Sequence, residues 1–253
     1  MLNITINTQP DEETCGPTSL HAVYRYYQDK VTLSKVIQGV ERVKNGGTLA
    51  ALLGKHALDR DYKATIYAYN LDVFDPTWFQ IPKLTSEQIV EKLKTQYRYK
   101  KSKRLWETSQ AYIDFLNKGG VILFRELTVN LLKAYFEQKI PVLTGLSATY
   151  LYQSKREFET RRGKLVHDDI RGEPSGHFVI LCGYDENKRH IVVADPHRRN
   201  PISSDNYYKV NISRLLNAIM LGVLTRDANL LIIEPKETFE QKKIIALKKQ
   251  GIP

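Results

Sequence analysis

Cysteine is scarce in this chain of 253 residues, which contains only Cys15 and Cys182. Domains stapled by disulfides use many more cysteines, so a disulfide framework is excluded and free thiols are expected. No apolar run approaches the roughly 20 residues that span a bilayer. The first residues, MLNITINTQPDEE, lack the basic stretch and apolar stretch of a secretion signal. We therefore expect a cytoplasmic protein with reduced thiols and no membrane association.

Acidic residues are outnumbered in this sequence. There are 38 lysines and arginines against 28 aspartates and glutamates, which gives a formal net charge of +10. Part of the excess lies in YRYKKSKR at 97–104 and ETRRGK at 159–164. Charged runs are commonly only solvated helix faces, and no zinc-finger spacing, RNA-binding aromatic motif or basic recognition helix accompanies them. Nucleic acid is therefore not expected as a partner, whereas an anionic peptide or protein substrate would suit the charge.

The order of the expected elements favours an α+β fold. Apolar residues at helical spacing predict helices over 15–27, 48–56, 86–100, 105–117, 128–138, 211–220 and 236–250. Strands are expected at 3–6, 63–69, 141–152, 177–184, 190–196 and 229–235. A helix-rich half thus precedes a strand-rich half. We expect one domain over residues 1–253, with a helical N-terminal lobe packed on an antiparallel β-sheet lobe.

Cys15 stands where a loop becomes a helix, in QPDEETCGPTSLHAV. The first turn of a helix presents unpaired N–H groups and a partial positive charge, and both favour a thiolate over a thiol. Position alone leaves two interpretations open, because a free cysteine is often only a small buried residue. Gln9 changes the balance. Its side-chain amide and the N–H of Cys15 would together form a two-donor hole for an oxyanion.

His177 is the best candidate, among six histidines, for a base acting on this thiol. It begins the apolar segment HFVILCGY after the loop GEPSG, and the turn DENKR joins that segment to HIVVADPH, which is typical of a β-hairpin. If Tyr184 pairs with His190, Val179 lies opposite Asp195. His177 and Asp195 are then diagonal neighbours on one face, with roughly 7–8 Å between their backbones.

Asp195 would hold one imidazole nitrogen of His177 and leave the other free to take a thiol proton. The same alternation turns Cys182 to the opposite face, so Cys182 is expected in the core rather than as a nucleophile. A metal site formed by Cys15, His177, Asp195 and His197 is the other interpretation. The short paired spacings of structural zinc sites are absent, so no metal or other cofactor is expected.

The segments QPDEETCGPTSLHAVYRYY and GHFVILCGYDENKRHIVVADP together resemble the papain-like cysteine peptidases. Within that clan they are most similar to the double-glycine leader peptidase-like family, which is cysteine peptidase family thirty-nine and its stand-alone bacterial relatives. The resemblance implies a papain-like two-lobe fold. It also implies four catalytic roles: Cys15 as nucleophile, His177 as general base and acid, Asp195 as the partner that orients His177, and Gln9 as oxyanion donor.

Three glycines are candidates for contacts with the substrate. In papain-like enzymes a Gly-Gly segment lets the substrate backbone pair beside the nucleophile, and Gly46 and Gly47 would take that part. Gly176, which directly precedes His177, is assigned to the same substrate-binding role. The helical stretch 70–140 lies outside the family's minimal pattern and would be an insertion or a substrate-selecting lobe.

The resulting expectation is a cysteine peptidase or amidase that cleaves a peptide or protein substrate through an acyl-enzyme intermediate. Two alternatives stay open. A transpeptidase or acyltransferase would use the same acyl-enzyme with an amine in place of water, and a catalytically silent module would keep the fold and bind peptides. Leader peptidases of this type are normally fused to an ABC transporter, and neither a membrane segment nor an ATPase is seen here. A double-glycine leader is therefore not assumed as the substrate.

Overall fold

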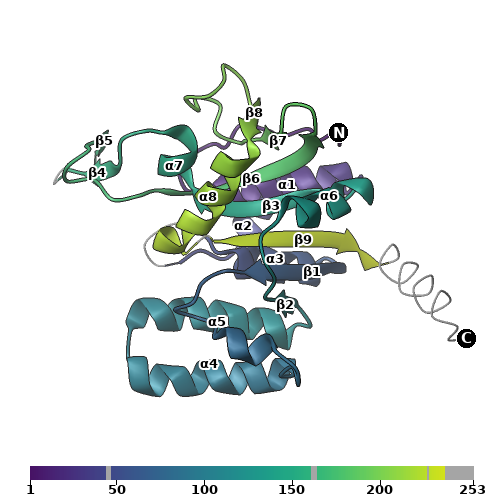
Figure 1. Cartoon of the computed structure of the whole chain (residues 1–253), viewed down its shortest axis with the longest axis vertical. Helices are drawn as coiled ribbons and strands as arrows, with labels where there is room; N and C mark the ends of the chain where they lie inside the picture. Colours follow the sequence, from purple (N-terminus) through teal and green to yellow (C-terminus); the bar gives the residue numbers. More distant parts are fainter. Residues whose placement is uncertain (44–46, 161–163, 227, 237–253) are drawn as a thin grey trace, which may run out of the picture.

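A seven-stranded sheet runs through the middle of the protein, and helices cover both of its faces (Figure 1). The computed structural model describes residues 1–43, 47–160, 164–226 and 228–236. The helices are α1 Cys15–Tyr26, α2 Leu33–Gly39, α3 Ala50–Asp59, α4 Ser86–Lys100, α5 Lys103–Asn117, α6 Val129–Glu137, α7 Ala148–Tyr152 and α8 Ile212–Leu221, with 3₁₀ turns η1 Pro76–Phe79 and η2 Gly222–Thr225.

The strands of the main sheet, in spatial order, are β2 Val121–Leu123, β1 Tyr62–Ala68, β9 Asn229–Pro235, β3 Val142–Ser147, β6 Gly176–Asp185, β7 His190–Ala194 and β8 Tyr207–Asn211. Within the described residues, neighbouring strands of this sheet run antiparallel except β1 and β2. A separate hairpin consists of β4 Glu157–Glu159 and β5 Leu165–His167. The expected α+β class, with a helical N-terminal part and a mostly antiparallel sheet, is confirmed.

Each face of the sheet has its own apolar core. Helices α1, α3 and α5 pack into one core, and α6, α7 and α8 into the other. Helix α1 contributes Leu20, Val23 and Tyr24, whose spacing places them on one side of the helix. Strand β6 is buried on both faces because its side chains alternate between the two cores. Cys182 lies in the core of α1, as predicted.

The β6–β7 hairpin contains a bulge that alternation alone did not predict. At the turn, Asp185 pairs with His190, one residue later than expected. The register then shifts between Leu181 and Gly183, so that Ile180 lies opposite Ala194. The predicted register is therefore wrong beside the turn. It is right at the open end of the hairpin, because the bulge cancels the offset of one residue.

Residues 3–6 form no strand, contrary to the prediction. The hydroxyl of Tyr207 donates a hydrogen bond to the carbonyl of Ile4 at 3.0 Å. The same hydroxyl oxygen accepts a hydrogen bond from the N–H of Ile6, also at 3.0 Å. A side chain of β8 therefore takes the place of a backbone ladder. The missed strand β8 is itself an alternating pattern, with Tyr208 and Val210 buried between exposed neighbours.

Two helix boundaries also differ from the prediction. The segment 141–152 is not one strand, because the hydroxyl of Ser147 accepts the N–H of Tyr150 and begins α7 there. Helix α3 begins at Ala50 rather than at residue 48, with Leu49 at its N-cap position, and the Thr48 hydroxyl donates to the carbonyl of Glu41 at 2.9 Å. The predicted helix at 236–250 falls almost wholly outside the described residues.

The stretch 70–140 contains the helical pair α4–α5, which lies at the lower end of the molecule in Figure 1 and packs through α5 against α3. Thr85 caps α4 reciprocally with Gln88, as a capping box does. The substrate-selecting role of this stretch stays a prediction. None of the described helices has the length and apolarity needed to cross a membrane.

Candidate active site

The start of α1 is fastened to the strand that carries His177. Cys15 is the first residue of α1 and is partly exposed. One turn further on, the buried hydroxyl of Ser19 donates to the carbonyl of Phe178 at 3.1 Å. Because Phe178 follows His177 directly, this hydrogen bond holds the helix start, with its unpaired backbone N–H groups, at the open end of β6.

Gly16 lets α1 approach its neighbours closely, and this predicts a stability effect. A Cβ at Gly16 would lie 2.6 Å from Cγ2 of Thr48, so a methyl group there requires movement. We expect Gly16→Ala to cost about 1–3 kcal/mol of unfolding free energy. Thr48→Ser removes Cγ2 and keeps the hydroxyl, so the double variant Gly16→Ala/Thr48→Ser should recover part of the loss. Urea unfolding of the three variants measures this, and equal stability of Gly16→Ala and the parent protein would contradict it.

His177 and Asp195 form a buried pair at the open end of the hairpin. Nε2 of His177 lies 2.8 Å from Oδ1 of Asp195, and the two residues are only 6% and 0% exposed. His177 is the second residue of β6, and Asp195 directly follows β7, so alternation brings them to one face as predicted. Cys15 lies near enough to His177 to contribute to the raised pKa of the imidazole. Because Asp195 occupies Nε2, Nδ1 is the nitrogen available to the thiol.

The charges of this pair stabilise each other. Burial favours a neutral imidazole, but the Asp195 carboxylate, followed by Cys15, raises the pKa of His177 well above its ordinary value. Burial also opposes ionisation of Asp195, yet His177 and the hydrogen bonds to the carboxylate hold the pKa of Asp195 below its ordinary value. These two shifts favour an imidazolium beside a carboxylate, which is the state that His177 reaches when it takes a proton from Cys15.

Four donors converge on the carboxylate of Asp195. Oδ1 accepts from His177 and, at 2.8 Å, from the backbone N–H of His197. Oδ2 accepts the hydroxyls of Tyr152 and Tyr208, each at 2.7 Å. Neither tyrosine was predicted to belong to the site. Tyr152 lies in the segment interpreted as a strand, and Tyr208 lies in the unrecognised β8.

Gln9 lies near His177, but its side-chain amide already makes one hydrogen bond within the protein. Its backbone N–H donates to the carbonyl of Pro196 at 2.9 Å, next to Asp195, and its Nε2 donates to the carbonyl of Asp11 at 2.8 Å. A side-chain amide carries two hydrogens, so one stays available to a substrate. The Oε1 atom of Gln9 is buried with no hydrogen-bond partner among the described residues.

The acidic turn before Cys15 has a structural basis. The carboxylate of Asp11 accepts the N–H of Glu13 at 2.9 Å, which closes an Asx-type turn. The carbonyl of Asp11 accepts from Gln9 and from the hydroxyl of Thr14. Glu13 points to solvent, where it pairs with Arg42 at 3.2 Å. Asp11 thus links the predicted oxyanion donor to the residue that precedes the helix.

The three glycines predicted to contact substrate differ in their placement. Gly46 lies outside the described residues. Gly47 has a φ of +70°, a conformation that glycine adopts readily, and the following residue, Thr48, packs against Gly16. Gly176 is exposed and lines a pocket beside His177. The structure therefore brings Gly176 to the site, and brings the segment after Gly47 beside the start of α1.

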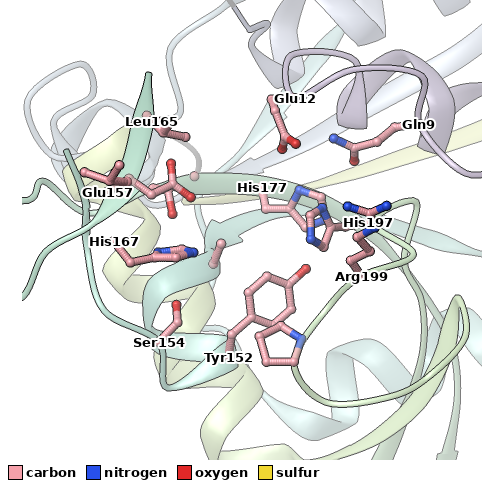
Figure 2. Close-up of a pocket in the computed structure, with 15 residues that line it drawn as sticks. Gln9, Glu12, Tyr152, Ser154, Glu157, Leu165, His167, His177, His197 and Arg199 are labelled. Carbon is pink, nitrogen blue, oxygen red and sulfur yellow. The ribbon is translucent and has the colours of Figure 1, made fainter. Parts of the chain in front are cut away.

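The pocket beside His177 has a volume of about 350 Å³ (Figure 2). Gln9, Glu12, His197 and Arg199 line the part next to His177, and Tyr152 lies below it in the view. The β4–β5 hairpin forms the opposite wall, with side chains that include Glu157, Leu165 and His167. Charged groups of both signs therefore border a pocket that reaches the buried histidine.

The described residues contain no group of three or more His, Cys, Asp or Glu side chains arranged to hold a metal ion. Each oxygen of Asp195 already accepts two hydrogen bonds. A metal centre formed by Cys15, His177, Asp195 and His197 is therefore not favoured by this geometry.

Several solved structures resemble the chain at low sequence identity. A candidate C39-like peptidase from Bacillus anthracis is 15% identical, with a TM-score of 0.48 over 91% of this chain and 94% of that one. A double glycine motif protease from an AMS/PCAT transporter, solved with its leader peptide, is 16% identical, with a TM-score of 0.42 over 92% and 93%. The peptidase domain of Streptococcus ComA, a bifunctional ABC transporter in a quorum-sensing pathway, is 11% identical, with a TM-score of 0.42 over 92% and 99%.

No curated protein matches the chain. The sequence model of the Peptidase_C39 like family, however, matches residues 1–217. This range contains both segments on which the resemblance was recognised. The chain belongs to the Peptidase_C39 like family.

Proposed function

We propose that this protein is a cysteine peptidase that cleaves peptide or amide bonds with Cys15 as nucleophile. The observation that carries the proposal is the buried pair of His177 and Asp195, whose Nε2 and Oδ1 atoms lie 2.8 Å apart, with Cys15 near enough to contribute to the raised pKa of His177. An imidazole held by a carboxylate and facing a nucleophile at a helix N-terminus is an arrangement suited to acyl transfer. Membership of a peptidase-like family supports the same reaction class.

In the proposed reaction, Nδ1 of His177 takes the proton of Cys15 while Asp195 stabilises the imidazolium. The thiolate forms a bond to the substrate carbonyl carbon, and the electron pair of the carbonyl π bond moves to oxygen. The backbone N–H of Cys15 and the second amide hydrogen of Gln9 stabilise this oxyanion. His177 then protonates the leaving amine as the C–N bond breaks, which leaves a thioester. A water molecule, deprotonated by His177, attacks the thioester and releases the acid and the thiol.

The substrate side of the proposal follows from the pocket. Gly176 is exposed at its edge and has no side chain, so an extended peptide can approach His177 there. The charged side chains of Glu12, Glu157 and Arg199, together with His167, border the same space. A polar peptide segment therefore fits the pocket better than an apolar one, and we propose a peptide or protein substrate.

Iodoacetamide labelling tests the nucleophile without knowledge of the substrate. Cys15 should be alkylated at least about 100-fold faster than Cys182 at neutral pH, since burial raises the pKa of the Cys182 thiol to about 12. His177→Ala should slow the labelling of Cys15 about tenfold or more, because the thiol loses its proton acceptor. Mass spectrometry of the digested protein locates and quantifies each adduct.

His190→Ala is the matched control, since His190 lies at the opposite end of the same hairpin, and it should leave the labelling rate of Cys15 unchanged. Slow and equal labelling of both cysteines in the parent protein would refute the proposed nucleophile. Unchanged labelling in His177→Ala would refute the role of His177 alone.

A further inference from the structure

Two tyrosine hydroxyls meet at one oxygen of Asp195. Tyr152 is the last residue of α7, and Tyr208 lies within β8, so separate elements deliver the two groups to Oδ2. Oδ1 is shared between Nε2 of His177 and the N–H of His197. An ionised carboxylate offers about four acceptor sites, so these four donors satisfy it fully although it is completely buried.

Both tyrosines act as donors across the working pH range. An ionised carboxylate only accepts hydrogen bonds, so the hydroxyl protons must point to Asp195. Burial, followed by the charge of Asp195, raises the pKa of Tyr152 and of Tyr208 far above its ordinary value. Neither hydroxyl therefore loses its proton while His177 titrates.

The division of donors between the two oxygens has a chemical consequence. A carboxylate held at Oδ1 alone can rotate about its Cβ–Cγ bond, and Oδ2 would be an unpaired buried charge. Two hydroxyls on Oδ2 fix the plane of the group, so that Oδ1 faces Nε2 of His177. Each hydrogen bond also withdraws negative charge from the carboxylate, which weakens its attraction for the imidazolium proton.

We propose that Tyr152 and Tyr208 are positioning residues, whose hydroxyls orient Asp195 toward His177 and moderate the charge that Asp195 presents to it. This inference rests on the proposed function of the Cys15, His177 and Asp195 group. It extends that function by two residues that act through Asp195 rather than on the substrate.

Other groups near His177 could affect its titration and are the same in every variant compared. They are Cys15 from α1, His197 and Arg199 from the loop after β7, and Glu12 from the loop before α1. The variants therefore change only the two hydroxyls. A purely structural role is represented by another buried tyrosine, Tyr67, whose hydroxyl lies 2.8 Å from that of Tyr135 in the same core.

The experiment compares Tyr152→Phe, Tyr208→Phe, the double variant and the control Tyr67→Phe with the parent protein. The titration of His177 is followed by nitrogen NMR of its imidazole, and the alkylation rate of Cys15 by iodoacetamide is measured over the same pH series. In the double variant we expect His177 to lose its proton at a pH higher by roughly half to one unit, because Asp195 regains the withdrawn charge. In each single variant the pH at which His177 loses its proton should rise by less, and in Tyr67→Phe it should not change.

An unchanged or lowered His177 titration in the folded double variant would overturn the inference, as would an equal shift in Tyr67→Phe. If the double variant does not fold, the two single variants make the same comparison with smaller shifts. The proposed function fails separately: it is refuted if Cys15 of the parent protein reacts no faster than Cys182. A reactive Cys15 together with an unmoved His177 overturns only the role of the tyrosines.

Discussion

Replacing Cys15 with alanine should abolish peptide cleavage, lowering the rate by at least about four orders of magnitude, because no other atom can form the thioester. Cys15 donates none of the hydrogen bonds that hold Asp195, so His177 and Asp195 should keep their geometry in this variant. A mixture of synthetic peptides incubated with the parent protein and with Cys15→Ala, then analysed by mass spectrometry, measures the difference. Circular dichroism should show the same fold for both.

Cys182→Ala is the control for this experiment. Cys182 lies in the core beside α1, 2% exposed, so its loss should lower stability slightly and leave cleavage unchanged. Cleavage that persists in Cys15→Ala and disappears in folded Cys182→Ala would contradict the proposed mechanism. Cleavage that persists in both variants would show that the activity does not depend on a thiol.

The pairing of His177 with Asp195 could be predicted because alternation along a strand depends only on counting residues. The prediction survived a wrong pairing at the turn, where Asp185 and not Tyr184 faces His190, since the bulge at Cys182 restores the count. Gly183 stands at the register shift, and a glycine within a strand often marks a bulge, but the glycine alone does not specify how the register changes. The open end of the hairpin was therefore correct partly because two errors cancel.

Tyr152 and Tyr208 could not be assigned to the site in the same way. Helix α7 spans only Ala148–Tyr152, and a short apolar segment after a strand cannot be distinguished from more strand by its periodicity. The alternation of β8 was visible in YYKVN, but its position beside β7 is a long-range pairing that the sequence does not specify. Contacts between elements that are far apart in the sequence were therefore not predicted, whereas contacts within one hairpin were.

The start of α1 shows a similar division. The helix and its first residue, Cys15, follow from apolar spacing, and the structure begins α1 there. What the acidic turn does could not be predicted, because Asp11 acts through hydrogen bonds to backbone groups of its neighbours. Such bonds depend on local dihedral angles rather than on residue type.

Replacing Asp195 with alanine should cost about 3–5 kcal/mol of unfolding free energy, because one member of a buried pair is removed. His177 and the hydroxyls of Tyr152 and Tyr208 would lose their acceptor together. Asp195→Asn should cost less. The asparagine carbonyl can accept from His177 and His197 while its NH₂ group faces the tyrosine hydroxyls, which can rotate to accept. Urea unfolding at a series of pH values compares the three proteins.

The pH dependence of the unfolding free energy distinguishes the loss of the Asp195 charge from the loss of side-chain packing. In the parent protein, the contribution of Asp195 is present above the ordinary pKa of a carboxyl and is lost as pH falls through its lowered folded value. The contribution of His177 is complete below the ordinary pKa of a histidine and is lost as pH rises through its raised folded value. Asp195→Asn removes both contributions, so its stability should vary less with pH in both windows. A pH profile identical to that of the parent protein would contradict the ion pair.

Asp195→Asn and the tyrosine variants should also change the pKa of His177 in opposite directions. Asparagine removes the counter-charge, so His177 should lose its proton at a lower pH than in the parent protein. Phenylalanine at Tyr152 and Tyr208 concentrates the charge on Asp195, so His177 should keep its proton to a higher pH. If the substitutions only loosened the packing of the site, the pKa of His177 would change in the same direction in Asp195→Asn and in the tyrosine variants. Opposite shifts, measured by NMR of the His177 imidazole, would therefore show that charge on Asp195, and not packing alone, sets the proton affinity of the base.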